Sequence, residues 1–264
     1  MESQNRNVWI LVAVIVVGLC CCALAIAAAA VGWFTIQPLD WTGATSLRSE
    51  RSEEAFVVGE TPSLKIDNFA GNVTVRTGER GVIRVVATKK APRVGDLGRI
   101  EIQTDEQNGD LQIRTSRPSG FMNAAIELEI TAPAGTRLDA DTGAGNVDID
   151  GLTGEIDARS GAGNVDVRGA AGTARLDTGA GNIGYQGTPQ GECRFETGAG
   201  NITLVLPADL NVQVDLNTGL GNIDVDYAVD GTDTRREVNG VIGDGSQGSI
   251  YAQSGTGNID LIRR

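Results

Sequence analysis

Residues 142–147, Thr-Gly-Ala-Gly-Asn-Val, are one of six copies of a hexapeptide with the pattern Ser/Thr-Gly-x-Gly-Asn-Ile/Val. The copies begin at Thr142, Ser160, Thr178, Thr197, Thr218 and Ser254. Their asparagines follow one another at spacings of 18, 18, 19, 21 and 36 residues. A fixed period of this length is typical of a stack of equivalent units rather than one globular core. The last spacing is twice 18, which predicts that one copy has degenerated or carries an insertion.

Short segments of alternating apolar and polar residues lie between the copies. In residues 146–150, Asn-Val-Asp-Ile-Asp, both apolar side chains share one face, and residues 155–159, Glu-Ile-Asp-Ala-Arg, repeat the pattern. Alternation with a period of two, bounded by glycine, indicates short β-strands. We therefore predict an all-β fold, a flattened parallel β-solenoid whose roughly 18-residue rungs hold two short strands each, stacked about 4.8 Å apart. The regular repeats begin at about residue 138.

The hexapeptide is expected to form a corner of each rung. Its glycines allow positive φ and close approach of stacked backbones. Asparagine tolerates left-handed conformations, and its amide can donate and accept along the stack, as in ladders that reinforce stacked strands. A ligand-binding row of asparagines is the functional alternative. The predicted corner ladder consists of Asn72, Asn146, Asn164, Asn182, Asn201, Asn222 and Asn258.

The sequence outside the regular repeats continues the strand pattern less evenly. Alternating segments occur at residues 82–88, 99–104, 110–115 and 125–131. Asn72 belongs to a shortened copy of the corner and precedes Asn146 by 74 residues, which is close to four periods. Residues 229–244 fit the pattern poorly and are expected to form an inserted loop or hairpin.

A long uncharged segment covers residues 8–34. It exceeds the roughly 20 apolar residues that cross a bilayer core, and Trp9 and Trp33 lie near its ends, as interfacial anchors do. A cleaved signal peptide is the alternative, but its apolar region normally has about 7–15 residues. We therefore expect one transmembrane helix over residues 8–34.

The expected organisation has four parts. A short tail at residues 1–7 precedes the membrane helix, a linker occupies residues 35–54, and the repeat domain covers residues 55–264. Arg6 is the one basic residue before the helix, and this slight bias favours a cytoplasmic N-terminus. The expected location is the cell membrane, with a single pass and an extracytoplasmic C-terminal domain.

Composition excludes several chemistries. The chain contains no histidine, which removes Ser-His-Asp and Cys-His catalysis and His-ligated zinc. A net charge of −12 disfavours nucleic acid as a partner. Cys193 is the one cysteine beyond the apolar segment, so a disulfide scaffold is excluded. Alternation places Cys193 and Phe195 on the inward side of a strand, which predicts a buried, inert thiol.

The acidic residues offer the remaining candidate chemistry. Aligned with the calcium nonapeptide Gly-Gly-x-Gly-x-Asp, the hexapeptide places an apolar residue such as Val147 where an oxygen ligand is needed. Outward-facing acids, among them Asp148, Asp150 and Asp166, alternate with arginines and neutral residues, as on a solvated face. Weak cation binding near these aspartates and acid–base work on glycans are the alternatives. We predict no catalytic residue, no cofactor and no metal site.

Most of residues 56–264 resembles the bacterial β-strand-repeat domain known as the "putative adhesin" domain. The matching features are the entry at residues 64–73, the Ala-Pro-Ala-Gly step at residues 132–135 and the repeated corners. This resemblance implies a fold of stacked β-strands, often anchored by one N-terminal helix, and it brings no catalytic motif.

The sequence thus predicts a membrane-anchored, non-enzymatic surface protein of the cell envelope. It would act by adhesion or as a scaffold, with a protein or a glycan at the cell surface as its partner. An accessory or sensory component of an envelope-stress system, with a membrane partner, is the alternative. A polysaccharide-active enzyme is a second alternative, against which the missing histidine and the mixed acid columns count.

Overall fold

The computed structural model describes residues 47–120 and 123–264. In this part the chain is all-β apart from the four-residue helix α2 (Val94–Leu97), and its strands form two sheets rich in parallel pairs. The predicted membrane helix at residues 8–34 lies outside the described residues. Within the described ranges, no helix is both long and apolar enough to cross a membrane. The predicted fold class is therefore confirmed at the level of an all-β protein.

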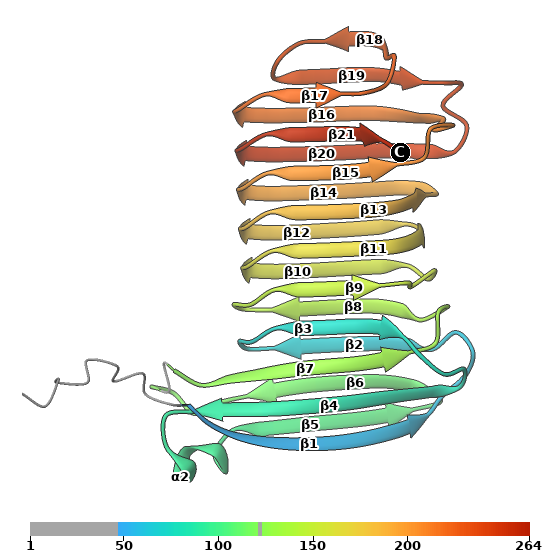
Figure 1. Ribbon diagram of the computed structural model, residues 1–264. Coiled ribbons are helices and arrows are strands. Elements are labelled where there is room, and N and C mark those ends of the chain that lie inside the picture. Colours follow the sequence, from blue (N-terminus) through green and yellow to red (C-terminus); the bar gives the residue numbers. More distant parts are fainter. Residues whose placement is uncertain (1–46, 121–122) are drawn as a thin grey trace, which may run out of the picture. The chain divides into compact units, whose positions relative to one another are not determined.

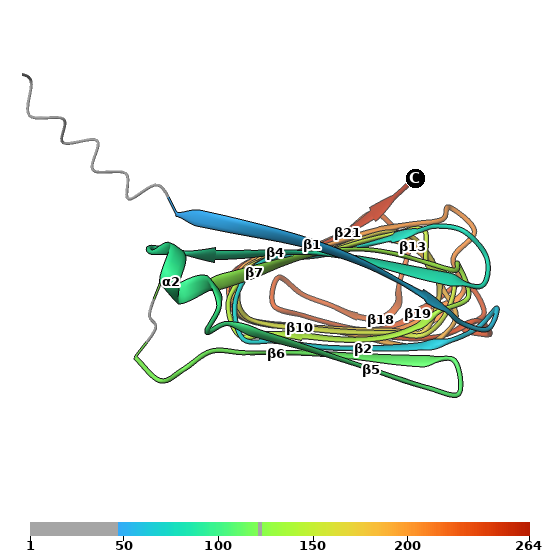
Figure 2. The same cartoon turned by 90° about the horizontal axis from the view of Figure 1, so that it is seen from below.

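The two sheets face each other as the broad sides of a flattened stack (Figures 1 and 2). Sheet A contains, in spatial order, β1 (Arg48–Val57), β4 (Val82–Ala91), β7 (Ala125–Ala132), β3 (Val73–Thr77), β9 (Val147–Asp150), β11 (Val165–Gly172), β13 (Ile183–Pro189), β15 (Ile202–Leu206), β21 (Ile259–Arg263) and β17 (Ile223–Val225). Sheet B contains β18 (Asp230–Asp233), β19 (Glu237–Ile242), β16 (Val212–Leu220), β20 (Gly248–Thr256), β14 (Gly191–Ala199), β12 (Ala174–Ala180), β10 (Ile156–Ala162), β8 (Arg137–Thr142), β2 (Ser63–Asn68), β6 (Asp110–Ser116) and β5 (Glu101–Gln107).

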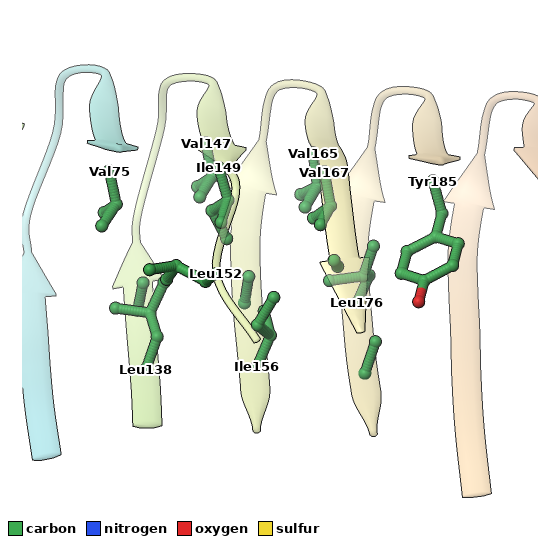
Figure 3. Close-up of a cluster of buried hydrophobic side chains, with 14 of the residues drawn as sticks. Val75, Leu138, Val147, Ile149, Leu152, Ile156, Val165, Val167, Leu176 and Tyr185 are labelled. Carbon is green, nitrogen blue, oxygen red and sulfur yellow. The ribbon is translucent and has the colours of Figure 1, made fainter. Parts of the chain in front are cut away.

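The core lies between the sheets, where the inward half of each alternating strand is buried. Figure 3 shows side chains of sheet A, such as Val165, pointing toward those of sheet B, such as Ile156. Both residues are at most 1% exposed. Cys193 and Phe195 are fully buried in β14, as alternation predicts, and burial raises the pKa of the Cys193 thiol. The alternation of apolar and polar residues therefore predicted correctly which face of each repeat strand is buried.

The middle of the stack repeats with the period of the hexapeptide. Val165 in β11 pairs with Val147 in β9 and with Ile183 in β13, a step of 18 residues each way, and both pairs are parallel. The next step, from Ile183 to Ile202, is 19 residues. Because the chain alternates between the sheets, each step adds one strand to sheet A and one to sheet B.

The C-terminal copy enters the stack out of sequence order. β20 and β21 pair with β14 and β15 on one side and with β16 and β17 on the other (Figure 1). The residues before β20 form the antiparallel pair β18 and β19, which lies beyond β16. An inserted hairpin therefore accounts for the doubled spacing, and the chain then returns to fill a place between two earlier rungs.

The N-terminal copy also has an unexpected neighbour. β2 and β3 pair directly with β8 and β9, so Asn72 lies one rung from Asn146. The expectation of about four periods between them is wrong, because β4 to β7 pair on the far side of β2 and β3. Asn108 and Gly109, with φ of 56° and 86°, connect β5 and β6, and two successive positive φ values favour an antiparallel hairpin.

The prediction that strands pair in parallel throughout the domain is therefore wrong at both ends of the stack. Within the described ranges the antiparallel pairs are β1–β4, β4–β7, β5–β6, β16–β19 and β18–β19. β1 begins at Arg48, so the last part of the expected linker at residues 35–54 lies in a strand. β1 is exposed over most of its length and rich in charge, which protects an edge strand from pairing with other chains.

Candidate functional site

The seven corner asparagines lie in one column, in the spatial order Asn72, Asn146, Asn164, Asn182, Asn201, Asn258 and Asn222. In every step the backbone N–H of one asparagine donates to the Oδ1 of its neighbour, at 2.8–3.0 Å. The donors are thus backbone groups, whereas the sequence suggested a ladder of side-chain amides. Left-handed backbone is also not used, since Asn108 is the one described non-glycine residue with positive φ.

A second column, of hydroxyl groups, was missed in the sequence. The first residue of each copy is buried, and its hydroxyl donates to a glycine carbonyl of the neighbouring rung, as Ser160 Oγ does to Gly145 O at 2.8 Å. The equivalent donors are Thr142, Thr178, Thr197, Thr218 and Ser254. The available signal was a hydroxyl residue at the inward position directly before each Gly-x-Gly.

Backbone atoms fill the corner itself. Gly163 has φ of +151°, and a Cβ there would lie 2.1 Å from Gly145 O. A Cβ on Gly161 would lie 2.4 Å from Gly143 O, although the φ of Gly161 is ordinary. The two glycines of a copy are therefore required by close stacking, and between rungs the corner has no room for a ligand.

The outer face of sheet B is hollowed beside β20. We call this depression, of about 420 Å³, the Ser249 hollow. Ser249 lies in register between Glu192 of β14 and Gln213 of β16, and its short side chain leaves space between two longer ones. Asp215 and Tyr251 form part of the wall.

A second depression adjoins the first. We call it the Thr173 hollow; its volume is about 360 Å³, and Asp157 and Arg175 contribute to its lining. Glu192 and Arg194 line both hollows and form the ridge between them. The polar face of sheet B thus offers two neighbouring concave places separated by one strand.

Arg194 is held in place from two sides. Its Cζ lies 4.2 Å from the ring centroid of Tyr251, a cation–π distance, and its Nη2 donates to Glu196 Oε1 at 2.5 Å. The hydrogen bond to Glu196 is the main cause of the raised pKa of Arg194. The Nε of Arg194 is buried and has no acceptor within the described part of the chain. Such a group calls for a bound water or ligand.

Asp157, in the Thr173 hollow, has a similar orphaned atom. Burial raises the pKa of Asp157, and the opposing effect of Arg159, to which its Oδ2 is bonded, does not cancel it. Its Oδ1 is buried without a hydrogen-bond donor among the described residues. Two unsatisfied polar atoms, one donor and one acceptor, therefore lie beside the same hollow.

The aspartates singled out in the sequence lie on the opposite face. Asp148 and Asp166 are neighbours in register on sheet A, and Asp150 pairs with Arg168. Burial raises the pKa of Asp166, Asp148 adds to the rise, and Arg168 opposes it. Within residues 47–120 and 123–264, no three side chains are grouped as metal ligands. The structure thus places Asp148 and Asp166 side by side, and weak cation binding near them stays an alternative from the sequence.

Sequence reasoning missed the sheet B site because it assumed sequence order. That order would place β16 directly beside β14, whereas in the structure β20 lies between them, and its Tyr251 pairs with Arg194 on one side and with Asp215 on the other. The hollow is built from β14, β16 and β20, which belong to three different rungs, and from β19 of the inserted hairpin, so it depends on where the C-terminal copy lies.

Comparisons with known proteins found several solved structures that are distantly similar to this chain. Among solved structures, a putative cell adhesion protein from Clostridium sporogenes is 17% identical with a TM-score of 0.44, covering 81% of this chain and 100% of its own. A putative adhesin from Bacteroides fragilis is 16% identical with a TM-score of 0.39, covering 81% and 97%. A putative lipid binding protein from Parabacteroides distasonis is 12% identical with a TM-score of 0.38, covering 80% and 96%.

No curated protein matches the chain. The family model described as Toastrack DUF4097 matches residues 102–261, which is more than half of the sequence. This range includes all six full copies of the hexapeptide. The chain therefore belongs to the Toastrack DUF4097 family.

Proposed function

We propose that the chain is a membrane-anchored, non-enzymatic surface protein of the cell envelope that binds a partner through the outer face of sheet B. The observation that carries this proposal is the pair of hollows beside Arg194, next to which Arg194 Nε and Asp157 Oδ1 are buried without a hydrogen-bond partner among the described residues. Strands stacked on both sides hold each wall residue, so the face is preorganised for binding.

A binding role fits the chemistry of the face better than catalysis does. Three acids have raised pKa values: Asp157 lies on sheet B, whereas Asp166 and Asp260 lie on sheet A. Two strands separate β11 from β21, which puts Asp166 and Asp260 about 14 Å apart, so no two of these three acids can act on one substrate bond. The corner copies are occupied by backbone contacts. What remains exposed is a firm surface with shallow polar depressions, which suits recognition.

The anchoring part of the proposal rests on the uncharged segment at residues 8–34. One transmembrane helix there, followed by an extracytoplasmic stack, would present sheet B at the cell surface. Protease treatment of intact cells tests this topology: cleavage within the repeat domain is expected, and complete protection would contradict it.

Partner binding is tested by crosslinking the full-length protein in its native membrane and identifying what is captured. Ser249→Trp fills the hollow from an outward position, and Thr203→Trp is the matched bulky change on the outer face of sheet A. We expect capture to be lost with Ser249→Trp and kept with Thr203→Trp. Equal capture by both variants would show that sheet B is not the binding face.

A further inference from the structure

We infer that the Ser249 hollow binds a neutral, polyhydroxylated ligand, namely a sugar unit of an uncharged glycan. This inference rests on the proposed binding role of sheet B and names the ligand class of that face. The hollow has hydrogen-bonding side chains without partners among the described residues, a mixed charge and a fixed aromatic wall.

Several hydrogen-bonding groups converge on the hollow without a partner. Within residues 47–120 and 123–264, the side chains of Glu192, Gln213, Asn239 and Ser249 make no hydrogen bond, and all four line the hollow. Amides and a hydroxyl both donate and accept, while a carboxylate only accepts. Neighbouring hydroxyls on a sugar ring also donate and accept, so they can satisfy such a mixed set.

The charge of the hollow disfavours charged ligands of either sign. Its lining contains two acidic residues, Glu192 and Asp215, and one basic residue, Arg194, on a chain whose net charge is −12. A sulfated or carboxylated glycan would meet a net negative surface. A lysine-rich peptide would meet the Arg194 guanidinium in the wall and would leave the neutral amides unmatched.

Tyr251 supplies a rigid apolar wall. Arg194 lies over its ring at 4.2 Å, and the Tyr251 hydroxyl is hydrogen-bonded to Gln253. The ring is therefore fixed before a ligand arrives, so little conformational entropy is lost on binding. Aromatic rings combine apolar contact area with a polar tip, which suits a ring that carries both C–H and hydroxyl groups.

The adjoining Thr173 hollow extends the site. The centre of each hollow lies over one strand, and β14 runs between these two strands. The two centres are therefore two strand spacings apart, which is about 10 Å. Arg194 Nε and Asp157 Oδ1, the orphaned donor and acceptor, belong to residues that line the Thr173 hollow. A glycan of several units can therefore occupy both places, and longer oligosaccharides are expected to bind more tightly than disaccharides.

Isothermal titration of the purified full-length chain tests the inference. The probes are the dimer and tetramer of N-acetylglucosamine, cellotetraose, a galacturonic acid tetramer as the anionic probe and octalysine as the cationic probe. We expect a neutral tetrasaccharide to bind and both charged probes to fail. Ser249→Trp should weaken this binding at least about tenfold, equivalent to about 1.4 kcal/mol. Tyr251→Ala is a second variant that should also weaken it, and Thr203→Trp should change it less than about twofold.

Circular dichroism confirms that each variant is folded before its titration is interpreted. The inference is overturned if the neutral sugars bind equally well to Ser249→Trp, to Tyr251→Ala and to the parent chain. It is also overturned if only a charged probe binds. If no sugar binds while Ser249→Trp still abolishes crosslinked capture, the sugar inference fails and the binding role of sheet B stands. If sugars bind at the hollow and no envelope partner is captured, the inference stands and the proposed surface role fails.

Discussion

The asparagine column makes a prediction about stability that distinguishes its observed geometry from a side-chain amide ladder. Asn164 Oδ1 accepts the backbone N–H of Asn182 at 2.9 Å, and Asn182 Oδ1 accepts that of Asn201 at 2.8 Å. In Asn164→Ala one acceptor is removed and one backbone donor is left to water. Because Asn182 is exposed, water can in part replace the lost acceptor of its backbone N–H.

The expected loss for Asn164→Ala is about 1 kcal/mol of the free energy of unfolding, the net value of one hydrogen bond. The double variant Asn164→Ala with Asn182→Ala removes two acceptors and should lose about 2 kcal/mol, although neighbouring changes need not add strictly. For a chain of this size that corresponds to a melting temperature lower by about 4–8 °C. Thermal unfolding followed by the β-sheet circular dichroism signal measures this shift.

Asn164→Asp is the decisive control. A carboxylate keeps the accepting oxygen and loses the amide donor, so the observed geometry predicts a change within about 0.5 kcal/mol. A ladder built from side-chain amides predicts that Asp is as damaging as Ala. Asn239→Ala, at an exposed position of β19 outside the column, should leave the melting curve unchanged. An unaltered curve for the double alanine variant would refute a stabilising role of the column.

Three further changes test the stack. Gly163→Ala should cost about 3 kcal/mol or more, because its φ is +151° and the new Cβ would lie 2.1 Å from a backbone oxygen, and urea denaturation measures this loss. Ala199→Cys with Thr256→Cys should form a disulfide on oxidation, whereas Ala199→Cys with Leu220→Cys should not, because one strand separates the latter pair. Asp166→Asn should raise the melting temperature near neutral pH and give no gain below about pH 3.8, because burial raises the pKa of this carboxyl above 3.8. The folded chain then binds the proton more tightly than the unfolded chain, so stability falls as pH rises from 3.8 through the raised pKa.

Each of these changes has a matched control. Gly59→Ala adds a methyl group where no atom lies within 4 Å, and it should be neutral. The parent chain, oxidised in parallel, gives the background from its native cysteines. Asp150→Asn removes an exposed carboxylate that is in register with Arg168, so it should not raise the melting temperature. A mild effect of Gly163→Ala, a crosslink between positions 199 and 220, or a gain from Asp166→Asn that persists in acid would each contradict the structure.

Local patterns predicted the interior of each rung well. Alternation placed Cys193 and Phe195 inward and Arg194 and Glu196 outward, and the structure agrees. The reason is physical: a one-residue slip would exchange the buried and solvent faces of a strand, so register is strongly specified. The Asn108-Gly109 hairpin carried an equally local signal that was overlooked, since this dipeptide favours two successive positive φ values.

The order of the rungs could not be read locally. The copies that begin at Thr218 and Ser254 offer the same hydroxyl, glycines and asparagine to the rung that ends in Asn201. Either copy could hydrogen-bond to Asn201 with similar geometry, and the structure selects Asn258. The selection depends on where the β18–β19 hairpin and its return loop fit, which involves contacts between distant segments of the chain.

The rung order also decides whether the candidate site exists. With Asn222 next to Asn201, β16 would lie directly beside β14, and Asp215 would replace Tyr251 as the neighbour of Arg194. Without β20 between β14 and β16, the surface would lack the aromatic ring of Tyr251. It would also lack the short side chain of Ser249, which leaves the space of the hollow. The return of the C-terminal copy thus brings together the ridge from β14, the floor and aromatic wall from β20, and further wall residues from β16 and β19. Repetition builds the scaffold, and the one departure from sequence order builds the surface on which binding is proposed.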